Sequence, residues 1–384
     1  MHGRRLVILI AGNFFVATSF MSVSGLLNEI AVSLQISVAK AGALIAAFAL
    51  TAGFFAPVLA TFGSRIDRRY LLTGALAVCA LASGLAAASD NYRHLLLARI
   101  VAAAASAVYT PQVAAAVSML TPEKDRAPVL GKLMLGWAIG SVVGGPLTVL
   151  IGGQFGWRTA MACIGAGGVA VSLLVWRAVP SNVHVPALNL QRWIEVARSP
   201  ALRWLMLTTA LNTAGNHFVF SYLAPTLSAL HQVSGSVLSA LYFVSGLGGL
   251  AGSVWAVSIL ARVSAARVAY WSTGVVIVVY LVWPLCAPWL PLLFTLQFLW
   301  SAGSAGFPSV QQSRFVAVAP TLASATIAMN SSLGYLGNSV GTSLGGSAWL
   351  WVGPRFLPWL GVVFLAASLF CSAASERATK IART

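Results

Sequence analysis

Long apolar stretches separated by short polar or charged breaks run along the whole chain. Their length is close to the roughly 20 residues that a helix needs to cross a bilayer. Charges and turn residues mark the breaks, as at 64–69 and 353–355. The pattern predicts twelve membrane-spanning helices, at 6–28, 40–63, 70–89, 94–119, 129–152, 159–178, 203–227, 236–261, 268–286, 290–312, 322–348 and 357–374. The fold class is therefore all-α integral membrane, arranged as two six-helix bundles.

Composition agrees with this pattern. Hydrophobic residues make up 59% of the chain, charged residues 8%, and the mean hydropathy is +0.87. A soluble domain averages about 25% charged residues, so a soluble fold of this sequence would expose apolar surface everywhere. The first apolar stretch, from Leu6 to about Leu27, is longer than the core of a signal peptide and predicts an uncleaved first span.

The net charge of +16 does not indicate nucleic-acid binding, because the basic residues lie singly or in small groups between apolar stretches. With the N-terminus inside, 18 of the 23 Lys and Arg residues fall in inside segments, 4 fall outside and Arg99 lies within a span. Inside loops of membrane proteins carry such an excess. We therefore expect both termini in the cytoplasm and the protein in a bacterial-type inner (plasma) membrane.

The one long connection divides the chain into a bundle at 1–179, a linker at 180–202 and a second bundle at 203–384. Within the linker, 190–198 reads as a short amphipathic helix at the membrane interface. The four cysteines lie in apolar stretches with no CxxC spacing, so we expect small core residues and no metal or cofactor.

The two halves of the sequence resemble each other. Gly12-Asn13 in the first span matches Gly215-Asn216 in the seventh, 203 positions later. Pro111 and Pro308 are 197 positions apart, as are Arg65 and Arg262. These offsets predict a duplicated six-helix unit. Parallel repeats of this kind place a substrate site between them near the membrane midplane.

Two rows of glycines repeat in the same way, at spans five and eleven. The spacing Gly-xxx-Gly lets helix backbones approach closely, so packing is the first interpretation, and a role in a moving interface overlaps with it. The row in span five consists of Gly136, Gly140 and Gly144 and continues into Gly145 and Pro146. The row in span eleven consists of Gly337, Gly341 and Gly345.

Several of these motifs together resemble the major facilitator superfamily. The loop 63–72 is similar to its loop motif, without the second glycine. Arg99 to Pro111 resembles its span-four pattern, and Gly140-xxx-Gly144-Gly145-Pro146 the antiporter signature of its twelve-span drug/proton antiporter and sugar-efflux branch. The resemblance implies efflux and leaves the substrate open. Two departures are Phe20, where many relatives carry glutamate, and the loop 262–267, which lacks the motif's acid.

None of the seven acidic residues lies in the middle of a span. A proton-coupled transporter usually carries a titratable group at depth. His217 is the candidate proton relay, because histidine titrates near neutrality; a structural hydrogen bond is the alternative. Arg99, the arginine within a span, is a candidate for binding a carboxylate or repelling a proton.

A charge cluster after span two reads as a cytoplasmic gate, formed by Gly63, Asp67, Arg68 and Arg69. The resemblance implies that Asp67 faces the start of span eleven. The alternative is a loop cluster that serves topology only.

Polar and aromatic residues at helical spacing within the spans are candidates for lining the cavity. Each is equally compatible with substrate contact and with contact between helices. They are Asn13, Phe20, Arg99, Tyr109, Gln112, Asn212, Asn216, His217, Tyr222, Gln297, Trp300, Gln311, Asn330 and Asn338.

We expect a monomeric secondary transporter, without cofactor, that exports a small organic molecule such as a drug-like compound, sugar or metabolite by alternating access. Proton antiport is one mode. An importer or facilitator without proton coupling is the first alternative, and a non-transporting sensor on the same scaffold is the second. An enzyme is not indicated, since HExxH, GxSxG and phosphate-loop motifs are absent from the sequence. The partners are the substrate, the bilayer and, under antiport, protons.

Overall fold

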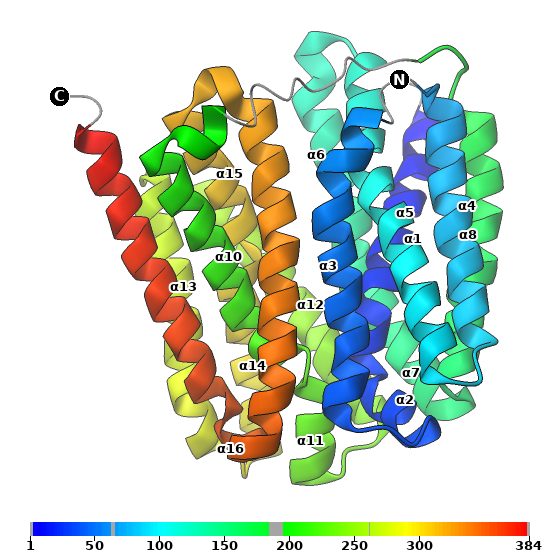
Figure 1. Cartoon of the computed structure of the whole chain (residues 1–384), viewed down its shortest axis with the longest axis vertical. Coiled ribbons are helices and arrows are strands. Elements are labelled where there is room, and N and C mark those ends of the chain that lie inside the picture. Colours follow the sequence, from blue (N-terminus) through cyan, green and yellow to red (C-terminus); the bar gives the residue numbers. More distant parts are fainter. Residues whose placement is uncertain (1–2, 63–65, 184–194, 261, 382–384) are drawn as a thin grey trace. The chain divides into compact units, whose positions relative to one another are not determined.

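The computed structural model describes residues 3–62, 66–183, 195–260 and 262–381 (Figure 1). These residues form helices and connecting turns, and no strand occurs among them. Two compact units appear. Unit 1 comprises Met1–Ser37, Phe54–Ala187 and Ser234–Phe243; unit 2 comprises Val38–Gly53, Leu188–Val233 and Val244–Thr384.

Unit 1 is built mainly from the first half of the sequence. Its elements are α1 (Gly3–Gly25), α2 (Leu27–Ser33), the end of α3 (Val38–Phe62), α4 (Arg68–Ala87), α5 (Tyr92–Met119), η2 (Glu123–Asp125), α6 (Arg126–Ile139), the π-helical turn η3 (Gly140–Gly144), α7 (Gly145–Phe155), α8 (Trp157–Ala178) and the start of α12 (Gly235–Ile259). Side chains of α1, α4, α5 and α8 form its apolar core, which includes Leu9, Leu76, Tyr109 and Val175.

Unit 2 contains most of the second half. Its elements are α10 (Pro200–Phe220), α11 (Leu223–His231), the rest of α12, α13 (Ala265–Cys286), α14 (Leu290–Ala305), α15 (Phe307–Val318), η4 (Pro320–Leu322), α16 (Ala323–Ile381) and the first part of α3. In Figure 1 the orange and red segments of α16 run in opposite directions from a sharp bend. Gly353, with φ of 76°, makes that bend, because a residue with a side chain rarely adopts a positive φ.

The prediction of twelve spans is confirmed. Ten helices among the described residues are long and apolar enough to cross a membrane. One of them, α16, holds the predicted spans eleven and twelve on either side of Gly353. The twelfth span is α10, whose amides and histidine keep its hydropathy below the level that the ten other helices reach.

Several predicted spans differ from the helices at their ends. The first spanning helix ends at Gly25 and is followed by the short α2. The tenth span divides at Gly306, and Pro308 lies in the first turn of α15. Proline suits the first turn of a helix because it lacks the backbone N–H that an interior position would need. The last span runs to Ile381 instead of 374. Of the predicted linker helix, residues 195–198 are helical and 190–194 lie outside the described residues.

Candidate functional site

In unit 1, Asn13 links three helices. Its Nδ2 donates to the Leu133 carbonyl of α6 at 3.2 Å, and its Oδ1 accepts from Thr110 Oγ1 of α5 at 3.1 Å. Thr110 in turn accepts from Trp137 Nε1 at 3.2 Å. The Phe20 and Trp137 rings lie 5.9 Å apart. These bonds use the amide of Asn13 to hold α1, α5 and α6 together.

Arg99 lies buried in the core of unit 1, as expected for a charged residue within a span. Its guanidinium donates to the Ser19 carbonyl of α1 at 2.8 Å. Cys79 and Ser106, whose Sγ and Oγ are 3.3 Å apart, belong to the same cluster. Tyr109 donates to the Leu9 carbonyl at 3.5 Å. Gln112, three residues further along α5, is buried as well.

In unit 2, α10 places Asn212 and Asn216 one turn apart, with His217 directly after Asn216. Asn212 Nδ2 donates to Thr273 of α13 at 3.0 Å. Asn216 Nδ2 donates back to Asn212, but its Oδ1 is buried without a hydrogen-bond partner among the described residues. His217 Nδ1 lies 3.1 Å from the Thr213 carbonyl, so Nδ1 carries the proton and Nε2 is left as an acceptor.

Aromatic rings adjoin these acceptors. Phe220, one turn after Asn216, stacks on Trp300 of α14 with centroids 4.9 Å apart and planes 15° apart. Trp300 Nε1 donates to Tyr280 of α13 at 3.0 Å, and the Tyr280 hydroxyl lies 3.2 Å from the Asn216 carbonyl. We call Asn216, His217, Phe220, Tyr280 and Trp300 the α10 cluster.

Most of the other candidates of unit 2 are engaged with neighbouring helices. Asn330 accepts from Thr209 of α10 at 2.6 Å, whereas Asn338 accepts from Thr342 of its own helix, α16, at 3.0 Å. Gln297 donates to Ser245 at 2.7 Å, Gln311 to the Leu205 carbonyl at 3.0 Å and Tyr222 to the Thr342 carbonyl at 2.7 Å. Polar side chains within spans often hold helices together in this way.

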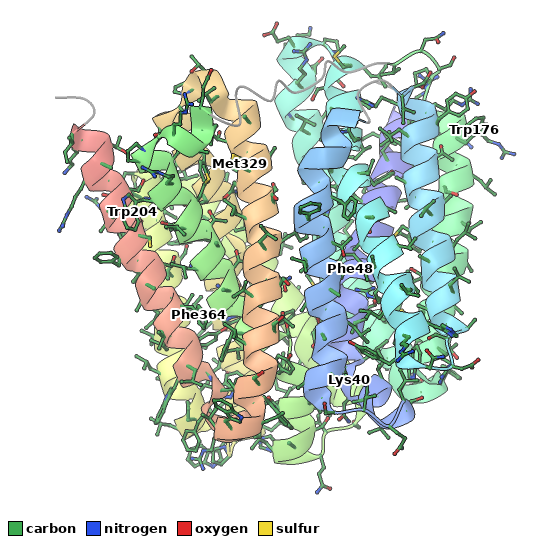
Figure 2. All side chains as sticks on the ribbon, in the orientation of Figure 1. Lys40, Phe48, Trp176, Trp204, Met329 and Phe364 are labelled. Atoms are coloured by element: carbon green, nitrogen blue, oxygen red, sulfur yellow. The ribbon has the colours of Figure 1, made fainter. Side chains whose placement is uncertain are left out.

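The charge cluster after span two caps a helix. Asp67 is the N-cap of α4, accepting from the Arg69 backbone N–H at 2.8 Å and from that of Asn182. Arg69 donates to the Trp176 carbonyl and lies over its ring, 4.2 Å from the centroid; Trp176 is labelled in Figure 2. These contacts all lie in unit 1. Gly63 is outside the described residues, and the approach of Asp67 to span eleven stays a prediction.

Both glycine rows pack against a neighbouring helix so closely that a side chain at these positions would overlap it. A Cβ at Gly136 or Gly140 would meet α1, near Ile10, Phe14 and Ala17. The second row packs in the same way against α10. A Cβ at Gly337, Gly341 or Gly345 would lie 2.2, 2.1 or 2.4 Å from a backbone carbonyl oxygen of α10. The π-helical turn η3 occupies Gly140–Gly144, within the antiporter signature, and Pro146 follows it in α7.

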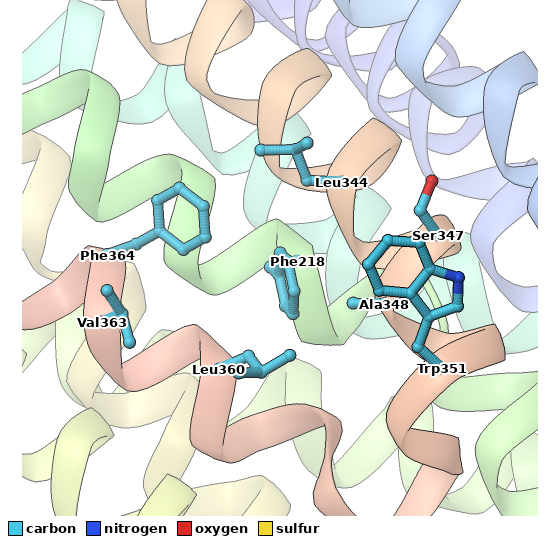
Figure 3. Close-up of a pocket in the computed structure, with 8 residues that line it drawn as sticks. All are labelled: Phe218, Leu344, Ser347, Ala348, Trp351, Leu360, Val363 and Phe364. Carbon is cyan, nitrogen blue, oxygen red and sulfur yellow. The ribbon is translucent and has the colours of Figure 1, made fainter.

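A pocket of about 380 Å³ lies in unit 2, between α10 and the two segments of α16 (Figure 3). Phe218, Leu344, Trp351 and Phe364 are among its lining residues, and Ser347 is the only polar one of the eight. None of the predicted cavity residues lines it. Its apolar walls suit hydrocarbon, not the polar contacts expected of a substrate site.

The candidates thus form two groups, one in each unit. Sequence reasoning missed Phe220 and Tyr280, although Phe220 follows Asn216 by one helical turn and Tyr280 follows Thr273 by two. It also assigned Arg314 to a loop. The structure buries Arg314 in α15, 3.7 Å from Glu376 of α16.

Comparisons with known proteins bear on the whole chain. A probable sugar efflux transporter of Mannheimia succiniciproducens is 26% identical over 366 residues, covering 95% of this chain and 92% of that protein. An uncharacterized MFS-type transporter of Bacillus subtilis, YbcL, is 23% identical over 376 residues, covering 96% and 94%. These names indicate a transporter rather than an enzyme.

Solved structures show the same fold. A bacterial homolog of the human lysosomal transporter Spinster, inward-facing and unoccupied, superposes with a TM-score of 0.80 at 19% identity, covering 98% of each chain. A D-xylose-proton symporter gives a TM-score of 0.76 at 15% identity, covering 97% of this chain and 96% of that one. Residues 9–342 match the family profile of the Major Facilitator Superfamily. The resemblance read from the motifs is confirmed, and this multi-pass membrane protein belongs to the Major Facilitator Superfamily of transporters.

Proposed function

We propose that this transporter exports a small neutral sugar by alternating access across a bacterial inner membrane, working as a monomer. The α10 cluster carries the proposal. Sugars present hydroxyl donors and flat apolar faces. Asn216 Oδ1 and His217 Nε2 are acceptors that a sugar hydroxyl could satisfy, and the Phe220–Trp300 stack is an apolar surface beside them. The names of the relatives at 26–27% identity, which are probable sugar efflux transporters, support the same substrate class and direction.

Uptake into inside-out membrane vesicles tests this proposal. Radiolabelled hexoses, pentoses and disaccharides are compared, with vesicles lacking the transporter as the background. Accumulation of a sugar in inside-out vesicles, and not in right-side-out ones, is expected for export. Failure to move any sugar while the protein remains folded would contradict the substrate class.

Import is the second candidate function, and the structural likeness to the D-xylose-proton symporter is the observation that favours it. Right-side-out vesicles distinguish import from export, because an importer accumulates substrate there. Proton coupling is tested separately, with a pH-sensitive dye enclosed in proteoliposomes. Sugar movement without proton flux, together with an unchanged rate in His217→Ala, would exclude antiport through His217.

A further inference from the structure

Glu29 is the acidic residue of unit 1 that the structure places inside the protein, although the sequence puts it just beyond a span. It lies in α2, between the fully buried Leu27 and Ile30. Its Oε2 is sealed from solvent and has no hydrogen-bond donor among the described residues. A carboxylate without a partner in such a place is unfavourable, whereas the protonated acid is not charged.

Segments of α1, α7 and α12, all in unit 1, meet at Gly25, close to Glu29 in the chain. A Cβ at Gly25, one turn before Glu29, would lie 2.3 Å from Val149 of α7 and 3.7 Å from the Tyr242 ring of α12. Tyr242 also interacts electrostatically with Glu29. The start of α12 also packs closely on α7. A Cβ added at Gly153 would lie 3.1 Å from Gly235 Cα, and Ser239 Oγ donates to the Pro146 carbonyl at 2.8 Å. We call residues 234–243 the α12 start.

No charged group among the described residues of unit 1 neutralises Glu29. α7 and the end of α1 contain no titratable side chain. From α8, Arg158 reaches Ser33, one turn beyond Glu29, at 3.1 Å and the Ser89 carbonyl at 3.0 Å. No ion pair with Glu29 forms within the described ranges. Burial therefore raises the pKa of Glu29, and its own backbone N–H only partly opposes this.

We propose that Glu29 is a proton-binding site that controls the packing of the α12 start onto α1, α2 and α7. The structure shows the α12 start packed, and in this arrangement the buried carboxyl is held as the neutral acid. Loss of the proton to water leaves a carboxylate that must be hydrated, so the ionised form favours separation of the α12 start. The ligand is a proton taken from the aqueous phase on the side that the charge count places outside.

The sign of the pH dependence follows from this. The packed arrangement binds the proton more tightly than the separated one. Glu29 stabilises the packed arrangement fully at a pH below the ordinary pKa of a glutamate. This stabilisation is lost as the pH rises through the pKa of Glu29 in the packed form, which burial raises. Because the rest of α12 belongs to unit 2, the proton acts on a helix that the two units share. The inference deepens the proposed transport function but does not require a particular substrate.

Cysteine labelling in proteoliposomes tests the proposal. The four native cysteines are replaced by serine, and Ser239→Cys reports on the packed surface. Ser236→Cys, at an exposed position of the same segment, corrects for the greater reactivity of thiols at high pH. Both variants are labelled with a membrane-impermeant maleimide between about pH 5 and pH 8, and the rate at position 239 is divided by the rate at position 236. We expect the ratio to rise with pH, by up to about tenfold per unit, as for a single proton.

Glu29→Gln, which cannot ionise, should keep the ratio low at every pH. Asp90→Asn, which removes an exposed acid at the same end of unit 1, should leave the dependence unchanged. A flat ratio in the protein with Glu29 intact overturns the proposal, as does a Glu29→Gln variant that keeps the pH dependence. If Glu29→Gln does not fold, Glu29→Asp takes its place and must retain a pH-dependent ratio. Labelling needs no substrate, so a failure to transport sugar contradicts the proposed function and not this inference.

Discussion

At the scale of single residues, the important distinction is between polar groups that are already satisfied and those that are not. Asn216 and Asn330 are both buried asparagines of unit 2. Asn330 Oδ1 already accepts from Thr209, while Asn216 Oδ1 accepts from no described residue. Only the second can accept from a ligand without first breaking a contact between helices.

Asn216→Ala should therefore weaken sugar binding by about tenfold, since a hydrogen bond contributes roughly 1 kcal/mol and an unpaired ligand hydroxyl costs more. Binding is measured by the concentration dependence of counterflow in proteoliposomes. Asn330→Ala is the matched control. It should lower the thermal midpoint and leave the affinity within about twofold. Equal losses of affinity in both variants would refute the assignment.

Trp300 offers a second test at this scale, because its ring stacks on Phe220 and its Nε1 bonds to Tyr280. Trp300→Phe keeps an aromatic face and loses one hydrogen bond, so we expect affinity to fall by less than about fivefold. Trp300→Ala removes the surface as well and should lower affinity by at least about tenfold. If the alanine variant binds as tightly as the phenylalanine variant, the stack does not hold the sugar.

At the scale of helices, spacing in the sequence predicted the close approaches, while breaks within spans were harder to predict. Gly337 and Gly341 pack on α10 because a run of glycines four apart leaves one helix face without side chains. The end of the first helix at Gly25 was missed, since apolar residues continue into α2 and periodicity alone does not register the break. The predicted first span consequently ended at residue 28, and Glu29 fell just beyond it. Partners such as Phe220 with Trp300, 80 positions apart in the sequence, depend on tertiary packing that no local pattern encodes.

Gly341→Ala should destabilise the packing of α16 on α10, because the added Cβ would lie 2.1 Å from the Ala214 carbonyl oxygen. Overpacking of this kind typically costs about 1–3 kcal/mol. The thermal midpoint of the purified protein should fall, and size-exclusion chromatography should show less monodisperse protein. Gly274→Ala in α13 is the control, since nothing lies within 4 Å of its added Cβ. Its midpoint should stay the same or rise slightly, as alanine favours helix; a similar loss in both variants would contradict the packing argument.

At the scale of the whole molecule, each unit contains one helix segment from the other half of the sequence, and the sequence repeat explains which segments these are. The first part of α3, Val38–Gly53, belongs to unit 2, and the α12 start belongs to unit 1. α3 and α12 are both 25 residues long and begin 197 positions apart, the offset that also relates Pro111 to Pro308. The exchanged segments are therefore equivalent positions of a duplicated unit. A duplication explains why both halves contribute the same helix end to the other unit.

The orientation of the whole molecule rests on the distribution of Lys and Arg, 18 inside against 4 outside, and is open to direct measurement. Fusions of green fluorescent protein, which matures only in the cytoplasm, and of alkaline phosphatase, which is active only outside, are made after Thr384 and after Trp289, in the turn between α13 and α14. We expect fluorescence after Thr384 and phosphatase activity after Trp289. An odd number of missed or extra spans before Trp289 would reverse the result there. Phosphatase activity at the C-terminus would reject its cytoplasmic placement. It would also reject the outside location of Glu29, which rests on the same charge count. The measurement therefore also determines from which side of the membrane Glu29 takes its proton.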